Sequence, residues 1–425
     1  MTLRRLRLLT AGESHGPGLS GILEGLPADL RVSTAKVDKE LARRQHGYGS
    51  GRRMQIERDR VQWTAGLRFG RTLGSPLAFS IPNRDWDNWS ERMAVEPTST
   101  SRQPKPITLA RPGHADLAGA IKYDTGDMRN VLERASARST APRVAAGAVC
   151  RQLLEACGVR LWSFVDQLGP VQAFGGVDEP AAHVPEGWVA ADRQEPTPLR
   201  CPDPEAEAAM IAEIDAAIEA GDSVGGSFVV VAEGMPVGIG SNSEWDTRID
   251  AAVAEALMGI QAVKGVEIGI GFGAVSQRGS AIHDEVEPGA PGWQRKTNRA
   301  GGTEGGMTNG AAVVARVAVK PVATLRKPLD SVDLASGEVR RAHIERSDVA
   351  IIPRAAVVGE AMLAIALADA LLADMGGDTI GDVKAAVRRR RRRSKGPRGE
   401  QAGGGLESLP DNAAAEATVV PGADA

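Results

Sequence analysis

Two histidines of this chain stand in glycine-rich turns, a setting in which an imidazole can do acid–base chemistry. His15 lies in Gly-Glu-Ser-His-Gly-Pro-Gly between two predicted strands, and His114 lies in Arg-Pro-Gly-His-Ala-Asp at the start of a predicted helix. Glycine lets the backbone turn sharply, and a helix N-terminus favours a neutral imidazole, which titrates near neutral pH. Either residue alone is more often a hydrogen-bonded loop histidine. Two of them beside arginine clusters favour general acid–base catalysis.

The remaining histidines lack such a setting and give no metal-ligand spacing. No HxH or HExxH pattern occurs among them, so the sequence offers no support for a metal site. These residues are His46, His183, His283 and His343.

Arginines gather in three stretches, Arg43–Arg60, Arg129–Arg143 and Arg388–Arg393. The first two lie in sequence that looks folded and could line an anion pocket. Arg134 and Arg138 are four residues apart and are predicted to share a helix face. Like charges there repel by about 0.2–0.5 kcal/mol unless an anion lies between them. A solvated arginine stripe is an equally good interpretation, although the small residues between them favour close approach of a ligand.

Asn298–Gly310 is the densest glycine run, and Asp348 falls just before a predicted buried strand. The run follows neither the Rossmann nor the P-loop pattern. It could bring backbone amides to a phosphate or a flavin ring, or it could be an ordinary mobile loop. Arg346 could hold Asp348 ionised as a base, but from the residues alone a plain ion pair is favoured.

Composition describes an ordinary globular protein that is not a nucleic-acid binder by overall charge. Of 425 residues, 42% are apolar and 25% are charged, with a net charge of −3. Three cysteines without CxxC spacing indicate a reducing compartment and no structural zinc. No signal-peptide pattern follows Met1. Ala361–Met375, the longest apolar stretch, is predicted to be a buried helix too short to span a membrane, so we expect a cytoplasmic protein.

Strands and helices are predicted to alternate in two blocks, about 1–160 and 203–376. One catalytic domain would occupy 1–385, with a surface excursion over 165–202 and a disordered tail rich in Arg, Gly and Ala over 386–425. Through its six arginines this tail could bind nucleic acid or other polyanions weakly, although a solvated tail is favoured. Predicted strands are Leu6–Thr10, Leu19–Glu24, Val61–Gly66, Leu77–Pro82, Ser227–Glu233, Gly265–Ile270, Val313–Val319 and Val349–Ile352. Predicted helices are Val32–Arg44 (N-cap Ser33), Ala115–Tyr123, Arg134–Cys157, Pro204–Ala220 (N-cap Asp203, ended by Gly221), Thr247–Met258 and one ending at Gly376.

Eight short segments, in this order along the chain, resemble the chorismate synthase family. The resemblance runs from about residue 7 to 380 and is weakest at 165–200. Each segment is short, but so many in one order make the match specific. They are Gly12–Gly16, Arg111–Asp116, Lys122–Tyr123, Arg134–Arg138, Ala262–Gly269, Ala300–Gly310, Lys320–Pro321 and Arg346–Asp348.

This resemblance implies an α+β fold, a β-α-β sandwich of two similar α/β halves with helices inside the sheets, assembled as a homotetramer. It implies a carbon–oxygen lyase acting on phosphates. The reaction would be the 1,4-anti elimination of phosphate from 5-enolpyruvylshikimate 3-phosphate to give chorismate, in the shikimate pathway of aromatic amino-acid biosynthesis. Reduced FMN would be required without net redox change. No extra domain for flavin reduction is visible, so an external flavin reductase activity would supply it.

The resemblance also assigns roles to individual residues. His15 would protonate the departing phosphate, His114 would control protonation of the reduced flavin, and Asp348 would help the flavin remove the C6 proton. The arginines fit independently, since guanidinium groups bind phosphates and carboxylates in pairs. The flavin site would include Arg134, Ala135, Ser136, Gln261, Ala262, Gly305, Lys320, Pro321, Val322, Ala323, Thr324 and Arg346. The substrate or nucleotide (NADP) side would include Arg44, Ser50 and Arg138, and no metal is expected.

Three positions depart from the family pattern: Ser50 where an arginine is usual, Ser139 where glutamate is usual, and Ile270 where aspartate is common. Loss of arginine at 50 removes an anion contact, for which Arg52 or Arg53 could substitute. Loss of glutamate at 139 leaves a neighbouring arginine without its expected partner. We therefore expect altered substrate affinity, and a Ser50→Arg or Ser139→Glu variant with an unchanged Michaelis constant would contradict this.

Two other function classes are open at this point. A flavin oxidoreductase acting on a small anionic substrate would consume NAD(P)H in step with product. A non-enzymatic polyanion-binding protein would depend on the arginine tail and lose function on truncation after Val387.

Overall fold

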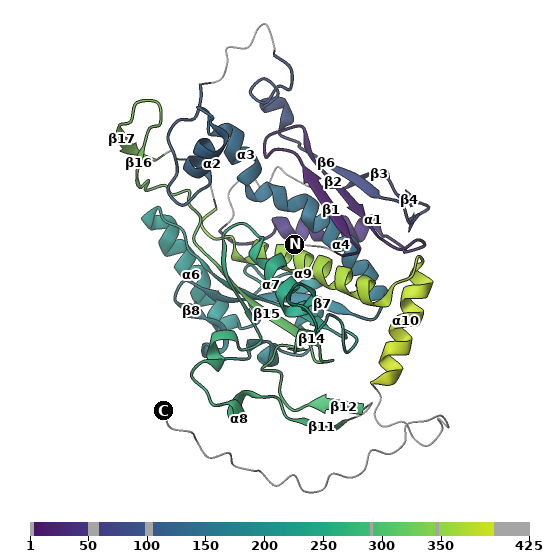
Figure 1. Cartoon of the computed structure of the whole chain (residues 1–425). Helices are drawn as coiled ribbons and strands as arrows, with labels where there is room; N and C mark the ends of the chain where they lie inside the picture. Colours follow the sequence, from purple (N-terminus) through teal and green to yellow (C-terminus); the bar gives the residue numbers. More distant parts are fainter. Residues whose placement is uncertain are drawn as a thin grey trace, which may run out of the picture.

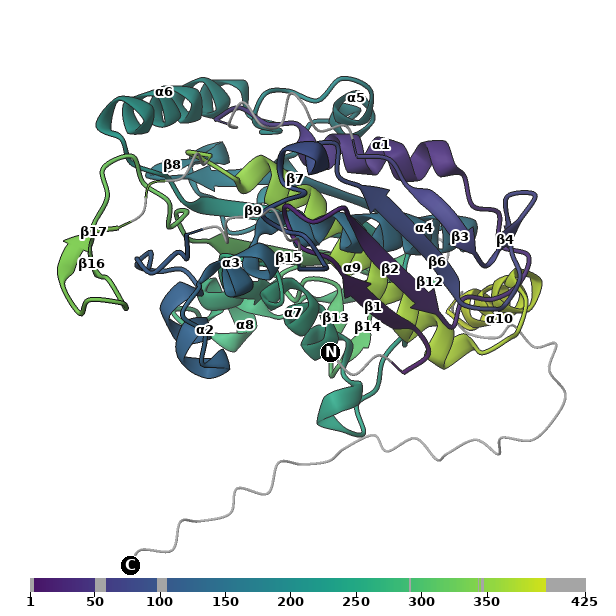
Figure 2. The same ribbon diagram turned by 90° about the horizontal axis from the view of Figure 1, so that it is seen from above.

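A layer of helices lies between two antiparallel sheets in the computed structural model, seen from two directions in Figure 1 and Figure 2. The structure describes residues 4–49, 59–97, 105–289, 292–342, 344 and 348–394. The first sheet has the strand order β1-β2-β6-β3 and the second the order β10-β15-β9-β7-β8. This is the predicted α+β sandwich. The strands are β1 (Arg7–Ala11), β2 (Gly18–Glu24), β3 (Gln62–Ala65), β6 (Leu77–Pro82), β7 (Arg160–Leu168), β8 (Val171–Gln172), β9 (Gly226–Glu233), β10 (Val263–Ile268) and β15 (Val313–Val319).

Three helices fill the space between the sheets: α1 (Thr34–Gln45), α4 (Ala141–Ala156) and α9 (Ile352–Met375). α4 packs on α9 and on β2, while α9 also packs on β7 and β9. The approach is so close that a Cβ on Gly147 would lie 2.5 Å from the Cβ of Ala361, and one on Gly359 would lie 2.4 Å from the Phe228 ring. Only glycine permits this spacing, so these two positions set the thickness of the sandwich.

The apolar character of α9 is explained by its place in the core. The helix has 24 residues, and by length and composition it could cross a membrane, but 94% of its most apolar window is buried inside the protein. The prediction of a buried helix is therefore confirmed. The prediction that it is too short to span a membrane is wrong, because the helix begins at Ile352 rather than at Ala361.

The predicted continuous helix Arg134–Cys157 is wrong. The chain forms α3 (Arg129–Ala135), a 3-10 turn (Ala137–Thr140) and then α4. Ser136 is extended, at φ −60° and ψ 145°, and its hydroxyl caps the Arg138 backbone N–H. Serine competes with helical backbone bonds in this way, and Pro142 fits only in the first turn of a new helix. Arg134 and Arg138 therefore do not share one helix face.

Two further boundaries differ from the sequence-based expectation. The excursion over 165–202 begins inside β7, a nearly wholly buried strand of the second sheet, and its later part covers the outer face of that sheet with α5 (Trp188–Gln194). Residues 349–352 form no strand, because Pro353 starts α9 at this point and Ala350 makes only an isolated bridge to Val224.

The expected disordered tail from residue 386 is wrong for 386–393, which belong to α10 (Ile380–Arg393). A capping box between Thr379 and Asp382 begins this helix. Arg390 and Arg391 then donate hydrogen bonds to backbone carbonyls of Gly238 (2.7 Å) and Gly234 (2.7 Å). Residues 395–425 lie outside the described residues.

Several local predictions hold in detail. Ser33 caps α1, and Asp203 and Gly221 bound the helix over Pro204–Ala220 as expected. The smaller elements are β4 (Leu67–Arg68), β5 (Arg71–Thr72), α2 (Asp116–Tyr123), α6 (Pro204–Ala220), α7 (Ile249–Met258), α8 (Gly279–Ile282), β11 (Val286–Gly289), β12 (Gly292–Arg295), β13 (Thr303–Glu304), β14 (Met307–Thr308), β16 (Asp330–Val332) and β17 (Val339–Arg341).

Candidate active site

His15 is held by a buried carboxylate from a helix far along the chain. It lies in the turn between β1 and β2, and its Nδ1 is 2.9 and 3.0 Å from the two carboxylate oxygens of Glu133 on α3. The backbone N–H of His15 donates to the same carboxylate at 2.8 Å. Burial acts to raise the pKa of Glu133, but the hydrogen bonds and charge of His15 outweigh it and hold the pKa below its ordinary value. Glu133 is therefore ionised beside the imidazole at neutral pH.

An aromatic ring covers the His15 imidazole. Trp89 stacks on it with ring centroids 3.8 Å apart and an interplanar angle of 29°. The guanidinium of Arg129 lies 5.2 Å from the same indole ring and also donates to Glu133 at 2.9 Å. The imidazole is thus fixed in both position and rotation.

The turn that carries His15 has the spacing G-x-S-x-G but is no nucleophile elbow. A nucleophile elbow is a sharp strand-to-helix turn. Gly12–Gly16 instead joins two antiparallel strands, β1 and β2. The hydroxyl of Ser14 is 3.1 Å from that of Ser136, a contact that ties the turn to the residue after α3.

His114 has a similar arrangement at the start of α2. Its Nδ1 is 2.5 Å from the carboxylate of Asp116, which also receives two hydrogen bonds from the Arg111 guanidinium, at 2.7 and 3.0 Å, and one from the Arg111 backbone N–H at 3.1 Å. Asp116 is completely buried. Burial acts to raise its pKa, but the bonds from His114 and Arg111 dominate and hold the pKa well below the usual range. Both predicted catalytic histidines therefore present Nδ1 to an ionised carboxylate.

Close packing of α2 on α3 brings these two histidine–carboxylate pairs into one region. A Cβ on Gly119 of α2 would lie only 2.3 Å from Val131 of α3, so the helices touch along this line. Asp116 begins α2, and Glu133 lies in the last turn of α3. In Figure 1 the two helices lie together, and α3 meets the turn between β1 and β2 through the hydrogen bond from the Ser14 N–H to the Glu133 carbonyl.

Contacts with the second half of the chain link His114 to the same region from the other direction. The Lys320 ammonium donates to the Gly113 carbonyl at 2.5 Å, and the Lys320 backbone N–H donates to the Ala262 carbonyl at 2.9 Å. The neighbouring Gln261 amide donates to the Ser139 hydroxyl at 2.7 Å, which in turn donates to the Ser136 carbonyl at 2.8 Å.

These contacts close a ring around the candidate site. From the His15 turn, the Ser14–Ser136 contact leads to the segment after α3, and the Ser139–Gln261 bond leads to the residues between α7 and β10. The two bonds of Lys320, which follows β15, then lead to the His114 turn. The α2–α3 pair completes the ring. The described residues that it joins are Ser14, His15, Gly113, His114, Asp116, Glu133, Ser136, Ser139, Gln261, Ala262 and Lys320.

A second group of predicted residues meets around Asp59. Arg44 and Arg138 donate to its two carboxylate oxygens at 2.7 and 3.0 Å, and all three side chains are buried. Burial acts to raise the pKa of Asp59, but the two guanidinium groups hold it below its ordinary value. Arg138 has a carboxylate partner in Asp59, so Ser139 does not leave this neighbouring arginine unpaired.

Asp348 is linked to this arginine group through Arg354, whose charge acts on Arg44. The Asp348 carboxylate pairs with Arg354 in the first turn of α9, and the Val349 N–H donates to the Gly49 carbonyl at 3.0 Å. The expected partner Arg346 and the expected anion contact Ser50 lie outside the described residues.

Arg134 and Arg143 form a pair of like charges. Arg134 donates to the Thr10 and Gly12 carbonyls (2.9 and 3.2 Å), and Arg143 donates to the Gly259 carbonyl at 2.9 Å. Burial and then the charge of Arg134 lower the pKa of Arg143. Among the described residues, no carboxylate forms a salt bridge with either guanidinium, so the positive charge here is unbalanced.

One predicted residue lies away from the ring. Gly305 is in the β13–β14 turn, and the adjacent Gly306 accepts a hydrogen bond from Ile249 at the start of α7. Gln261 follows the other end of α7, so the ten-residue helix, about 15 Å long, separates them. Among the other predicted flavin residues, Ala135 ends α3. Ala323 lies 3.7 Å from a Cβ built on Gly113, and the Val322 carbonyl accepts a hydrogen bond from the Ser223 hydroxyl. Pro321 and Thr324 are the chain neighbours of these two residues.

Sequence reasoning missed the carboxylates. Asp116 stood two residues after His114 in a motif already singled out, which was a usable signal. Glu133 and Asp59 gave none, since Glu133 is 118 residues from His15 and Asp59 is 79 from Arg138.

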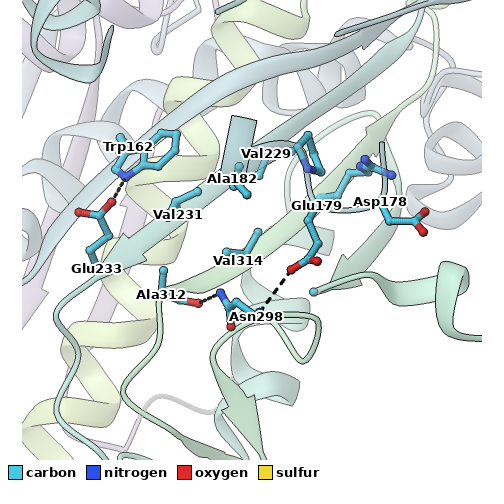
Figure 3. A pocket seen from close by; sticks show the side chains of 14 residues that line it. Trp162, Asp178, Glu179, Ala182, Val229, Val231, Glu233, Asn298, Ala312 and Val314 are labelled. Carbon is cyan, nitrogen blue, oxygen red and sulfur yellow. Dashed lines mark hydrogen bonds between the residues drawn. The ribbon is translucent and has the colours of Figure 1, made fainter. Parts of the chain in front are cut away.

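A cavity of about 210 Å³ lies elsewhere, on the outer face of the second sheet. Figure 3 shows Trp162, Val229, Val231 and Val314 forming its apolar floor, with Glu233 bound to the Trp162 indole N–H at its edge. None of the predicted site residues lines it. The candidate site is therefore identified by its charged groups rather than by this cavity.

Comparison with known proteins gives one consistent result. The family model described as chorismate synthase matches residues 6–372. Relatives named chorismate synthase include one from Aquifex aeolicus, 51% identical over 90% of this chain and 97% of its own length. Another, from Symbiobacterium thermophilum, is 53% identical over 88% and 96%. A solved structure titled as a crystal structure of chorismate synthase is 41% identical, with a TM-score of 0.73, and covers 93% of this chain and 99% of its own.

Proposed function

The chain belongs to the chorismate synthase family, enzymes of the lyase class, and from this premise we propose that it converts 5-enolpyruvylshikimate 3-phosphate to chorismate. The reaction removes a proton from C6 and releases phosphate from C3 in a 1,4-anti elimination. The C–H electron pair becomes part of the new diene, and the C–O pair leaves with phosphate. Nothing is oxidised overall. The observation that carries this proposal is the ring of contacts that joins two histidine–carboxylate pairs to Gln261 and Lys320.

The residues on this ring fit reduced FMN. The buried Oε1 of Gln261 has no hydrogen-bond partner among the described residues, and such an acceptor needs a donor of the kind the flavin ring carries. The unbalanced cations of Arg134 and Arg143 suit a phosphate. Arg134, Ser136, Gln261, Ala262 and Lys320 would hold the cofactor. When bound, a reduced flavin supplies electron density that assists cleavage of the allylic C–O bond.

The protein's own groups then have separate tasks. His15 would donate a proton to the departing phosphate, and His114 would control the protonation of the reduced flavin. Asp348 would take part in accepting the proton that the substrate loses. Arg44 and Arg138 would contribute positive charge toward the substrate's phosphate and carboxylates, and binding such groups in a fixed orientation accounts for a large part of the rate.

An anaerobic assay tests the proposal. The full-length protein would be incubated with dithionite-reduced FMN and 5-enolpyruvylshikimate 3-phosphate, and chorismate and phosphate would be measured together. We expect equal amounts of both without stoichiometric flavin oxidation, and a fall of about 10²–10⁴-fold in kcat for His15→Ala and for His114→Ala. Consumption of NAD(P)H in step with product would indicate an oxidoreductase instead, and no phosphate release would refute the proposal.

The wider setting is proposed from the same family membership. We infer that the enzyme acts in the cytoplasm as a homotetramer and receives reduced FMN from a separate reductase activity. A nucleotide such as NADP would meet the chain near Arg44 and Ser50. Size-exclusion chromatography with light scattering tests the assembly, and a trimer, dimer or monomer at working concentration would contradict it.

A further inference from the structure

We propose that Glu133 is a positioning residue for the elimination: it fixes the His15 ring with Nδ1 against its carboxylate, so that Nε2 is the nitrogen that transfers the proton. This inference rests on the proposed function. Glu133 does not touch substrate in this scheme and acts only through His15.

The geometry leaves the carboxylate little freedom. Glu133 is 2% exposed, and both its oxygens lie within 3.0 Å of His15 Nδ1. It also accepts the His15 backbone N–H at 2.8 Å. The Glu133 carbonyl accepts the Ser14 N–H at 3.1 Å, so the helix holds the histidine turn by backbone and side chain together.

This arrangement suits a group that donates a proton in each turnover and must then take up a new one. Before transfer the imidazolium donates from both nitrogens, and the carboxylate stabilises its charge. After Nε2 has given up its proton, Nδ1 still carries a hydrogen and keeps the same bond to Glu133. No ring flip or tautomer change is needed between turnovers.

Given the surrounding charges, the negative charge of Glu133 determines whether the protonated form of His15 is favoured. Two cations and two other carboxylates lie around the pair. One cation donates to Glu133 directly, the second cation and one carboxylate contact the Trp89 indole that stacks on His15, and the other carboxylate lies two residues before His15 in its turn. With Glu133 ionised, protonation of His15 brings the sum of these charges from −1 to 0. With a neutral amide at 133 it would bring the sum from 0 to +1, which disfavours the imidazolium. The groups are Arg129, Arg92, Asp85 and Glu13.

Two substitutions separate this role from simple packing. Glu133→Gln keeps the size and one acceptor oxygen but removes the charge, and Glu133→Asp keeps the charge on a shorter stem. Glu155→Gln is the matched control, because Glu155 is a partly exposed carboxylate on α4 whose only described partner is Lys36. We expect Glu133→Gln to lower kcat about 10–100-fold with KM changed much less, and the alkaline limb of the kcat–pH profile to move to lower pH. Glu133→Asp should restore part of kcat, and the control should match the wild type.

A second readout does not depend on turnover. Nitrogen-15 NMR of the His15 imidazole in the wild type should show Nδ1 protonated throughout its titration, and Glu133→Gln should lower the pH of the midpoint. An unmoved midpoint and an unmoved alkaline limb would overturn the inference. If Glu133→Gln does not fold, the inference is tested by the protonation of Nδ1 in the wild-type spectrum and by the kcat–pH profile of Glu133→Asp. If the wild type releases no phosphate, the proposed function fails, but the NMR result still judges Glu133.

Discussion

Replacement of Asp59 by asparagine should reveal how strongly the buried arginine group depends on one carboxylate. Asp59 is 5% exposed and accepts from Arg44 and Arg138, which are each 6% exposed. Asparagine is nearly the same size, so packing is kept while the charge is lost. Two buried guanidinium groups would then share a neutral partner.

The expected magnitude follows from breaking a buried pair. Removal of one partner from a buried ion pair costs about 3–5 kcal/mol, because the other charge stays buried without compensation. With a urea m-value of roughly 3 kcal/mol per molar, the midpoint of unfolding should fall by about 1–2 M at pH 7. Asp29→Asn is the control: its exposed pair with Arg71 should be worth less than about 1 kcal/mol.

The effect should also depend on pH in a defined direction. The pKa of Asp59 is lowered from an ordinary value of 3.8, so its stabilisation is fully present above that value. As pH falls below 3.8 towards the lowered pKa, the native carboxylate is protonated and the stabilisation is lost. The wild type and Asp59→Asn should therefore converge in stability in strong acid.

The assay is urea unfolding followed by circular dichroism at pH 7 and at several values below 4, with and without added phosphate. An anion that binds the uncompensated guanidinium charge should recover part of the loss in Asp59→Asn but not in Asp29→Asn. A loss below about 1 kcal/mol at pH 7, or a difference that does not shrink in acid, would refute the reasoning.

Three further outcomes are expected. Asp116→Asn should lower kcat about 10–100-fold, and adding His114→Ala should cause little further loss because the two residues act as a unit; full additivity of the two effects would contradict this. Arg143→Gln should raise the dissociation constant of the phosphate-bearing ligand that Arg143 contacts by about 10–100-fold, since a hydrogen bond to a charged group contributes about 1.5–3 kcal/mol. Titration calorimetry with reduced FMN and with substrate, measured separately, identifies this ligand, and unchanged binding of both would exclude the role. Truncation after Ser394 should leave kcat and Tm unchanged. Truncation after Val387 removes the Arg390 and Arg391 contacts and should lower Tm by about 2–5 °C. Equal Tm values for the two truncations would show that these contacts do not stabilise the protein.

Much of the site's composition could be predicted from the sequence, but its partners could not. His15 and His114 were identified because glycine turns and rare histidines are local features. Their carboxylates were not, because a sequence carries no signal that pairs Glu133 with a residue 118 positions away. The same holds for Gln261 and Ser139, which are 122 residues apart.

The sequence by itself determined the local elements and the family. Cap residues such as Ser33 and Asp203 act within one turn of helix, so the pattern that contains them predicts the boundary correctly. The break at Ser136 and the start of α9 follow local signals that the periodic pattern masked, a capping serine and prolines in the first helical turns. The continuation of α10 depends on tertiary structure, because its arginines bind backbone carbonyls of Gly234 and Gly238. Tertiary structure also decided which charges meet, because ion pairs between distant segments form only when the core brings their elements together. Helix packing thus turns separate histidines and carboxylates into one site.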